Sequence, residues 1–237
     1  MYLSSSLQTG HLPGGRHRVL ERMRGLSRRE RRDLHAAGQA ALEATQAFLR
    51  NGTTVVSEVI GKSPYVEWAH YPEHDSKTPT GALFYYHAHA ARQRIDGEHG
   101  HFHVFAANRR TDCPADQRYT HIVGLSVDAR GMPIRVFTTN RWVTAECWED
   151  AERVCALARR TRLKTAPAHA VGAWLDAVLA FFRPQVDDVL YLRDARVRAL
   201  AGHGNLFEDR RRHILSQCRI DFSTQILALE ELGGYTP

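Results

Sequence analysis

The chain has 237 residues, of which 43% are hydrophobic and 24% are charged, and its formal net charge is +6. This balance is typical of a globular protein with a sizeable core, and it excludes a disordered or fibrous chain. The four cysteines include no Cys-x-x-Cys pair, which excludes a disulfide-rich scaffold and a thiolate zinc finger.

The first residues lack a basic segment followed by an apolar one, so we expect no secretory signal. The most apolar stretch, residues 168–182, contains His169 and Asp176 and is shorter than the roughly 20 residues of a membrane span. We therefore expect a cytoplasmic protein with reduced thiols and no membrane contact.

Positive charge is concentrated between residues 16 and 32, which contain eight arginines and only two acidic residues, Glu21 and Glu30. We interpret residues 1–26 as a flexible basic arm. Such an arm can bind phosphates without sequence preference, but no aromatic residue alternates with these arginines to stack on bases. Nucleic acid is therefore not a favoured partner.

Local patterns predict one helix followed by strands. Ser27-x-x-Glu30 is typical of a capping box, and the apolar spacing that follows predicts a helix over residues 27–52. The β-branched run 53–60 predicts a strand, and the three prolines of residues 61–81 predict a long loop.

Four further strands are predicted, at residues 82–91, 99–107, 121–127 and 132–139, before the apolar period changes to that of helices near residue 144. The fold class is therefore α+β: a central antiparallel sheet with an N-terminal helix and a C-terminal run of helices packed on one face. Residues 27–237 form one domain, divided into a helix (27–52), a histidine-rich sheet (53–142) and a helical part (143–237).

Histidine is the unusual residue, with 14 copies, eight of them between residues 70 and 121. Side chains alternate along a strand, so each His-x-His string places its imidazoles on one face, where they can bind one metal ion. The predicted metal ligands come from two such strings: His87, His89, His99, His101 and His103.

Whether the two strings share a face depends on the turn at residues 96–97. A two-residue turn would put them on opposite faces, whereas a three-residue loop places His89 opposite His103 and His87 opposite Phe105. We favour the second register because it also gathers apolar residues such as Phe102 on the other face, toward the helices.

Three neighbouring residues are candidates for supporting roles. Glu98 could orient an imidazole or act as a general base. His70, in a loop able to cover the site, is either a further ligand or a solvated histidine, and the second reading is favoured. His121 begins the next strand and could face either side of the sheet.

The strings Trp68-x-His70-Tyr71-Pro72, Tyr85-Tyr86-His87-Ala88-His89-Ala90 and Glu98-His99-Gly100-His101-Phe102-His103 resemble those of an uncharacterised bacterial family of unknown function. The resemblance extends from about residue 30 onward. It implies that the strings belong together, and it implies no activity.

The leading interpretation is a mononuclear non-haem metalloenzyme, of the oxygenase or hydrolase class, acting on a small-molecule substrate. Its cofactor would be one transition-metal ion, Fe(II) or Zn(II), with Cu as a further option, since all three accept imidazole ligands. One alternative is a non-catalytic metal or haem carrier, and another is a nucleic-acid-binding module that uses the basic arm. The catalytic residues and the oligomeric state stay open.

Overall fold

The computed structural model describes residues 7–201 and 205–233, and it confirms the predicted α+β fold. Its centre is a seven-stranded sheet in the order β1-β7-β6-β5-β4-β3-β2. β1 runs parallel to β7, and all other neighbours are antiparallel. The strands are β1 (His11–Leu12), β2 (Tyr71–Lys77), β3 (Leu83–His87), β4 (Gly100–Ala107), β5 (Tyr119–Val127), β6 (Pro133–Thr139) and β7 (Ile214–Arg219).

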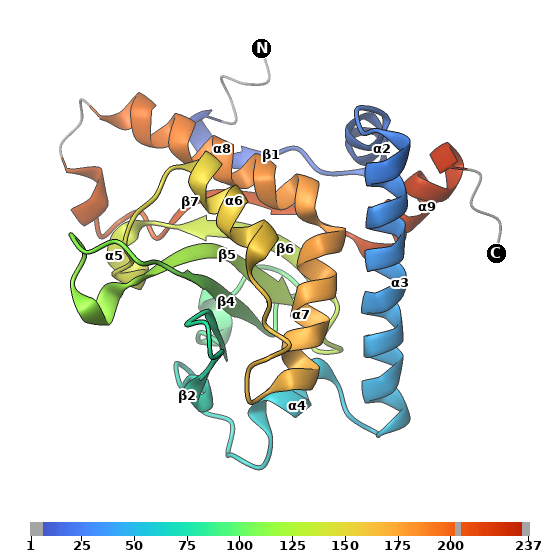
Figure 1. Cartoon of the computed structure of the whole chain (residues 1–237), viewed down its shortest axis with the longest axis horizontal. Helices are drawn as coiled ribbons and strands as arrows, with labels where there is room; N and C mark the ends of the chain where they lie inside the picture. The colour runs from blue at the N-terminus through green and yellow to red at the C-terminus, as the bar shows by residue number, and fades with distance from the viewer. Residues whose placement is uncertain (1–6, 202–204, 234–237) are drawn as a thin grey trace.

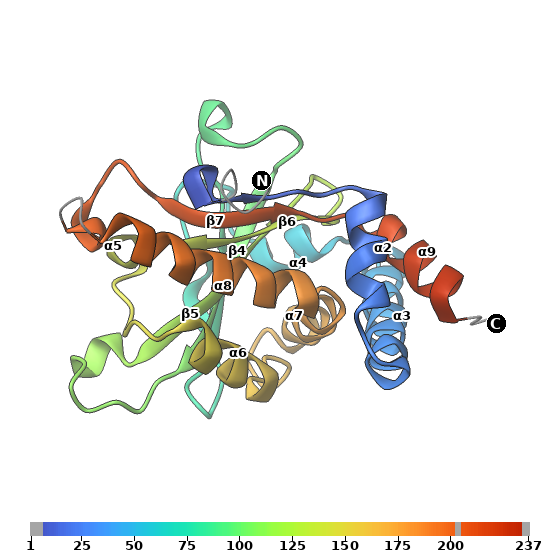
Figure 2. The same ribbon diagram turned by 90° about the horizontal axis from the view of Figure 1, so that it is seen from above.

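The long helices lie on one side of this sheet. Figure 1 shows α6 (Ala151–Arg160), α7 (His169–Phe181) and α8 (Arg183–Leu200) crossing its face, with α3 (Arg28–Arg50) beside α7. α2 (Arg16–Arg24) and α9 (Phe222–Gly233) pack together at one end of this layer (Figure 2). The two shortest helices are α4 (Val55–Ile60) and α5 (Arg141–Thr144).

The core forms where β3 and β4 face the helices. Phe84 and Tyr86 of β3 and Phe102 and Val104 of β4 are fully buried. The ring of Phe102 lies 5.8 Å from that of Trp174 in α7, measured between centroids. The apolar face of the histidine strands is therefore the face that carries the packing, as predicted.

The register of β3 with β4 differs from both predicted hairpins. His87 lies opposite His101, and Tyr85 lies opposite His103. The connection is longer than expected because β3 ends at His87 and residues 91–93 form a 3-10 turn. The pairing is displaced by four residues from the favoured register, and an even displacement leaves the side chains of the paired residues 83–87 and 101–105 on their predicted faces.

The helix predicted over residues 27–52 is confirmed as α3, and its capping box is formed by Ser27 and Glu30. The strand predicted over residues 53–60 is wrong, because this run forms α4. Thr54 and Ser57 cap that helix reciprocally, and three valines at helical spacing are buried. Capping and packing thus outweigh the β propensity of the run.

Two further predictions need correction. The loop expected at residues 61–81 contains β2, an edge strand beside β3. The part expected to be helical, residues 143–237, contains β7, which lies between β1 and β6. The buried residues of β7 are Leu215, Ser216 and Cys218. They do not form a strict apolar-polar alternation, so the pairing with the neighbouring strands, and not the sequence pattern, places this segment in the sheet.

The arginine-rich segment is not a flexible arm in the part that the structure describes. Residues 16–24 form α2, whose Val19 and Met23 are buried. Arg22 Nε lies 2.6 Å from Asp188 Oδ2, and Arg16 pairs with Glu231 at 2.9 Å. α2 is therefore docked on the domain by apolar contacts and ion pairs.

The expectation of reduced thiols is also corrected. Cys113 and Cys147 form a disulfide, whereas Cys155 and Cys218 are free and buried. Cys147 lies before α6, the helix that carries Cys155. Within residues 7–201 and 205–233, no helix is both long enough and apolar enough to cross a membrane.

We predict that Phe102→Ala lowers the free energy of unfolding by about 3–5 kcal/mol, because it leaves a cavity in a packed core. Leu227→Ala, at a side chain that is 54% exposed, is the control and should change stability by less than about 0.5 kcal/mol. Urea denaturation measures both variants. Equal losses in the two would contradict the assignment of the core to this face.

Candidate metal centre

Three imidazoles meet on the sheet face turned away from the helices. His87 comes from β3, and His101 and His103 come from β4. One ring nitrogen from each can be chosen so that all three lie within 4.8 Å of one another. His101 and His103 are buried and His87 is half-buried, so the group can hold a metal ion shielded from solvent.

The protonation state of His101 follows from its neighbours. Its Nδ1 lies 2.6 Å from Oε1 of Glu98, and a carboxylate can only accept, so this nitrogen carries the proton. In the neutral ring, Nε2 is then an unprotonated ligand atom. Nε2 of His87 lies 2.7 Å from it and donates its proton to it. A metal ion would take the place of this shared proton.

Glu98 is held as an anion by a second partner. Its Oε2 lies 2.9 Å from the guanidinium of Arg135, and both side chains are almost fully buried. Burial opposes ionisation of Glu98, but the hydrogen bond from His101 and the charge of Arg135 outweigh it, and the pKa of Glu98 is lowered. Arg135 also donates to Ser126 of β5 and Gln217 of β7, so its position is fixed from two neighbouring strands as well as by Glu98.

His103 has a corresponding partner on the next strand. Its Nδ1 lies 3.0 Å from Nε2 of His121, and Nδ1 of His121 lies 3.3 Å from Oγ1 of Thr139. When Nδ1 of His103 donates along this chain, its Nε2 is left as the ligand atom. Hydrogen bonds of this kind orient ligating histidines in metalloproteins.

Burial keeps these imidazoles neutral. Desolvation, followed by repulsion from His101 and other neighbouring histidines, lowers the pKa of His87 to about 2. The pKa of His103 is lowered well below its usual value, and that of His101 is also lowered, both chiefly by burial. Neutral imidazole is the form that coordinates metals.

An aromatic ring closes one side of the cluster. Phe137 of β6 stands edge-on to His101, with ring centroids 5.3 Å apart, and to His103 at 5.8 Å. It reaches them by lying over Gly124 of β5, where a Cβ atom would overlap the ring. The missing side chain at Gly124 is therefore what allows Phe137 to pack against the imidazoles.

The other predicted ligands lie differently. His89, beyond the end of β3, contacts the rings of His87 and His101 and stacks on Trp68 at 4.1 Å between centroids. His99 lies apart from the cluster, since its Nδ1 bonds to the hydroxyl of Tyr86. The structure brings four of the five predicted rings into contact, three of them at ligand distance.

His70 lies beside the cluster without joining the three ligands. Its ring stacks on Tyr85 at 3.9 Å between centroids, and its Nδ1 lies 3.2 Å from Asp75 Oδ1. It also meets the ring of His87 edge to face. The segment that carries it therefore forms part of the wall of the site.

The imidazoles stand at the floor of a cavity of about 770 Å³. Its walls come from the β2 segment, the connection after β3, and the region around α5 and β7. Most of them are apolar or aromatic, including Trp68, Ile95, Phe105, Trp142 and Ile214. The cavity has the size and character of a small-molecule site.

A family model described as a domain of unknown function (DUF6969) matches residues 35–220. The chain belongs to this family. No curated protein and no solved structure matches it. The match spans every histidine of the cluster and both strands that carry them, so the candidate metal centre lies inside the family's domain.

Several residues of the site were not found from the sequence. Arg135, Thr139, Phe137 and Gly124 reach it from β5 and β6, and no local pattern distinguishes them from ordinary strand residues. His121 was recognised as a candidate, but its contact with His103 depends on the β4–β5 register.

We predict that Gly124→Ala destabilises the protein by about 1–3 kcal/mol, because the new methyl group displaces Phe137. Adding Phe137→Leu should restore part of that loss, since the smaller side chain vacates the overlap. Gly25→Ala, at an exposed αR position, is the matched control and should be close to neutral. Additive losses in the double variant would contradict the contact. Thermal melting compares the parent, Gly124→Ala, Phe137→Leu, the double variant and Gly25→Ala.

Proposed function

We propose that the protein is a mononuclear metalloenzyme, with His87, His101 and His103 as the metal ligands and a small molecule bound in the cavity above them. The observation that carries this proposal is the convergence of three neutral imidazoles on the floor of a cavity of about 770 Å³. Three protein ligands with an open side are typical of catalytic rather than structural metal sites.

His87 and His101 could hold a metal ion with little rearrangement. Two nitrogens bound to one tetrahedral ion at about 2.0–2.1 Å lie roughly 3.3 Å apart. The Nε2 atoms of His87 and His101 are 2.7 Å apart, so they need to separate by only about half an ångström. Side-chain rotation of half-buried His87 can supply this movement, while Glu98 holds His101 in place.

This arrangement favours an enzyme over the alternative of a saturated metal or haem carrier. His89 contacts the cluster, but it is stacked on Trp68 and stands outside the group of three at ligand distance. A coordination position facing the cavity would thus remain for water or substrate. The ion, Fe(II) or Zn(II) with Cu as a further option, would supply an electrophilic centre for activating oxygen or water.

The cavity walls indicate the substrate class. Arg135, an arginine of the cavity lining, is neutralised by Glu98 and donates to two further acceptors. The remaining lining is largely aromatic and aliphatic. We therefore infer a small, mainly apolar substrate, whose ring or chain packs between the aromatic side chains.

Nucleic-acid binding receives less support from the structure. Arg16 and Arg22 of the basic segment are engaged by carboxylates of α9 and α8, and their helix is packed on the domain. A groove of alternating arginines and stacking aromatics, which single-stranded nucleic acid requires, is not formed by the described part of this segment.

We predict that protein purified without a histidine tag carries about one transition-metal ion per chain. His101→Ala should lose the ion and keep the fold, because the opposite face of β4 carries the packing. His99→Ala, two residues away on the same segment, is the matched control and should retain it. Elemental mass spectrometry with circular dichroism measures both properties. Full occupancy in His101→Ala, or a metal-free parent that takes up none, would overturn the proposal.

We further predict that Glu98→Gln weakens metal binding by about 10–100-fold, the usual cost of removing a carboxylate behind a ligating histidine. The amide cannot hold Nδ1 of His101 protonated as firmly as the carboxylate does, so its Nε2 is a poorer ligand. Competition with a chromophoric chelator gives the affinity. Glu73→Gln, at an exposed position of β2, should leave it unchanged. Equal affinities of the Glu98 variant and the parent would refute this role.

A further inference from the structure

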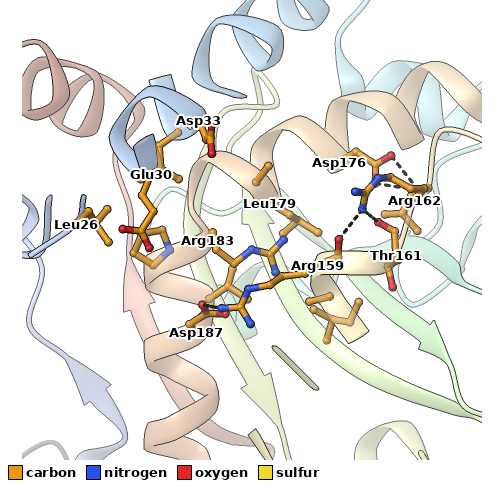
Figure 3. Close-up of a pocket in the computed structure, with 17 residues that line it drawn as sticks. Leu26, Glu30, Asp33, Arg159, Thr161, Arg162, Asp176, Leu179, Arg183 and Asp187 are labelled. Carbon is orange, nitrogen blue, oxygen red and sulfur yellow. Dashed lines mark hydrogen bonds and ion pairs between the residues drawn. The ribbon is translucent and has the colours of Figure 1, made fainter. Parts of the chain in front are cut away.

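A second cavity, of about 610 Å³, lies on the opposite side of the sheet from the imidazoles. It is a groove between the beginning of α3, the end of α6, and the helices α7 and α8 (Figure 3). Its floor is apolar and buried: Leu34, Ile122, Leu163, Leu179 and Val186.

The walls of the groove carry charged groups of both signs. Arg159 and Arg183 stand on the side formed by α6 and α8, Arg162 follows the end of α6, and Glu30 and Asp33 project from α3 across from them (Figure 3). Asp176 and Asp187 complete the set.

Every carboxylate of the groove has at least one partner among the described residues. Asp187 pairs with Arg159 through Oδ2 at 2.7 Å, whereas its Oδ1 is buried and has no hydrogen-bond partner among the described residues. Asp176 accepts from the backbone amides of Leu163 and Lys164. Glu30 accepts from the amide of Ser27 in the capping box, and Asp33 lies 4.0 Å from Arg29.

The three arginines differ in how many hydrogen-bond acceptors and carboxylates they contact. Arg159 has Asp187, and Arg162 donates to two carbonyl oxygens at the end of α6. Within the described residues, Arg183 has no acceptor within hydrogen-bond distance and no carboxylate within 4.0 Å. Its side chain is half-buried, and burial lowers its pKa; the negative charge of Asp187 opposes this shift, and the positive charges of Arg159 and Arg162 add to it. A guanidinium desolvated in this way is stabilised by a bound anion.

From this accounting we propose that the groove binds a small organic carboxylate, whose negative charge pairs with Arg183 and whose apolar body lies on the floor formed by Leu34, Ile122 and Leu179. One uncommitted guanidinium matches a single negative charge, and the planar fork of arginine matches a carboxylate in two parallel hydrogen bonds. The apolar floor distinguishes such a ligand from inorganic phosphate. The volume is within the range of small-molecule sites.

This site is independent of the proposed metal centre. The helices that line it cover the apolar face of the sheet, and the imidazoles project from the other face. Ile122, on the floor of the groove, directly follows His121, which supports the metal cluster, so the two cavities are separated by the thickness of the sheet.

The test uses octanoate as the probe, with 1-octanol and inorganic phosphate as comparison ligands, in isothermal titration calorimetry of the full chain. We expect saturable binding of octanoate, and binding at least tenfold weaker for 1-octanol, which has the same chain without the charge. Phosphate should bind at least tenfold more weakly as well. Octanol binding as tightly as octanoate, or no saturable octanoate binding in the low millimolar range, would overturn the proposal.

Variants assign the binding to this groove. Arg183→Gln should weaken octanoate binding at least tenfold, and Arg183→Lys should fall between it and the parent because it keeps the charge but loses the fork. Arg160→Gln, an exposed position on α6 outside the groove, is the matched control and should bind like the parent. His101→Ala should also bind like the parent. Unchanged binding in both Arg183 variants, or loss in His101→Ala, would refute the site.

Discussion

The pairing of β3 with β4 is the constraint from which both sides of this protein follow. Because side chains alternate along each strand, the register that sets His87 opposite His101 also sets Phe84 opposite Val104. The same two strands thus supply a layer of imidazoles on one face and a layer of fully buried aromatic and aliphatic side chains on the other. A displacement by one residue would bury the histidines under the helices without partners and expose the apolar layer.

Burying several imidazoles together has a free-energy cost that the surrounding groups offset. Glu98 and Arg135 form a buried ion pair, and breaking such a pair leaves an uncompensated charge. The pair is joined to the cluster through Nδ1 of His101, and a chain of hydrogen bonds through His121 supports His103. The carboxylate of Glu98 fixes which nitrogen of His101 faces the centre, and the contact with His121 orients the ring of His103. The site is therefore organised by its supporting residues before any ion binds.

The histidines of the site could be predicted from the sequence, but the residues that β5 and β6 contribute to it could not. The histidine strings lie within about 20 residues of one another, and strand alternation alone places them on one face. Glu98 was recognised because it adjoins them. Arg135 and Phe137 arrive from β6, and Gly124 from β5, so their roles depend on registers that no local pattern encodes. Arg183, which forms no hydrogen bond or ion pair with the described residues, could not be predicted as a binding residue, because its surroundings are built by four helices together.

The sequence by itself determined the class of fold, the helix that begins at Ser27, and the face on which the histidines lie, because these depend on capping and on short-range periodicity. Tertiary structure decided the rest. The run 53–60 became a helix because its valines pack at helical spacing, and β7 joined the sheet because β1 and β6 flank it. Cys113 and Cys147 were brought together across 34 positions of sequence. Each of these outcomes rests on contacts between distant segments, whose free energy outweighs the local preference of the residues involved.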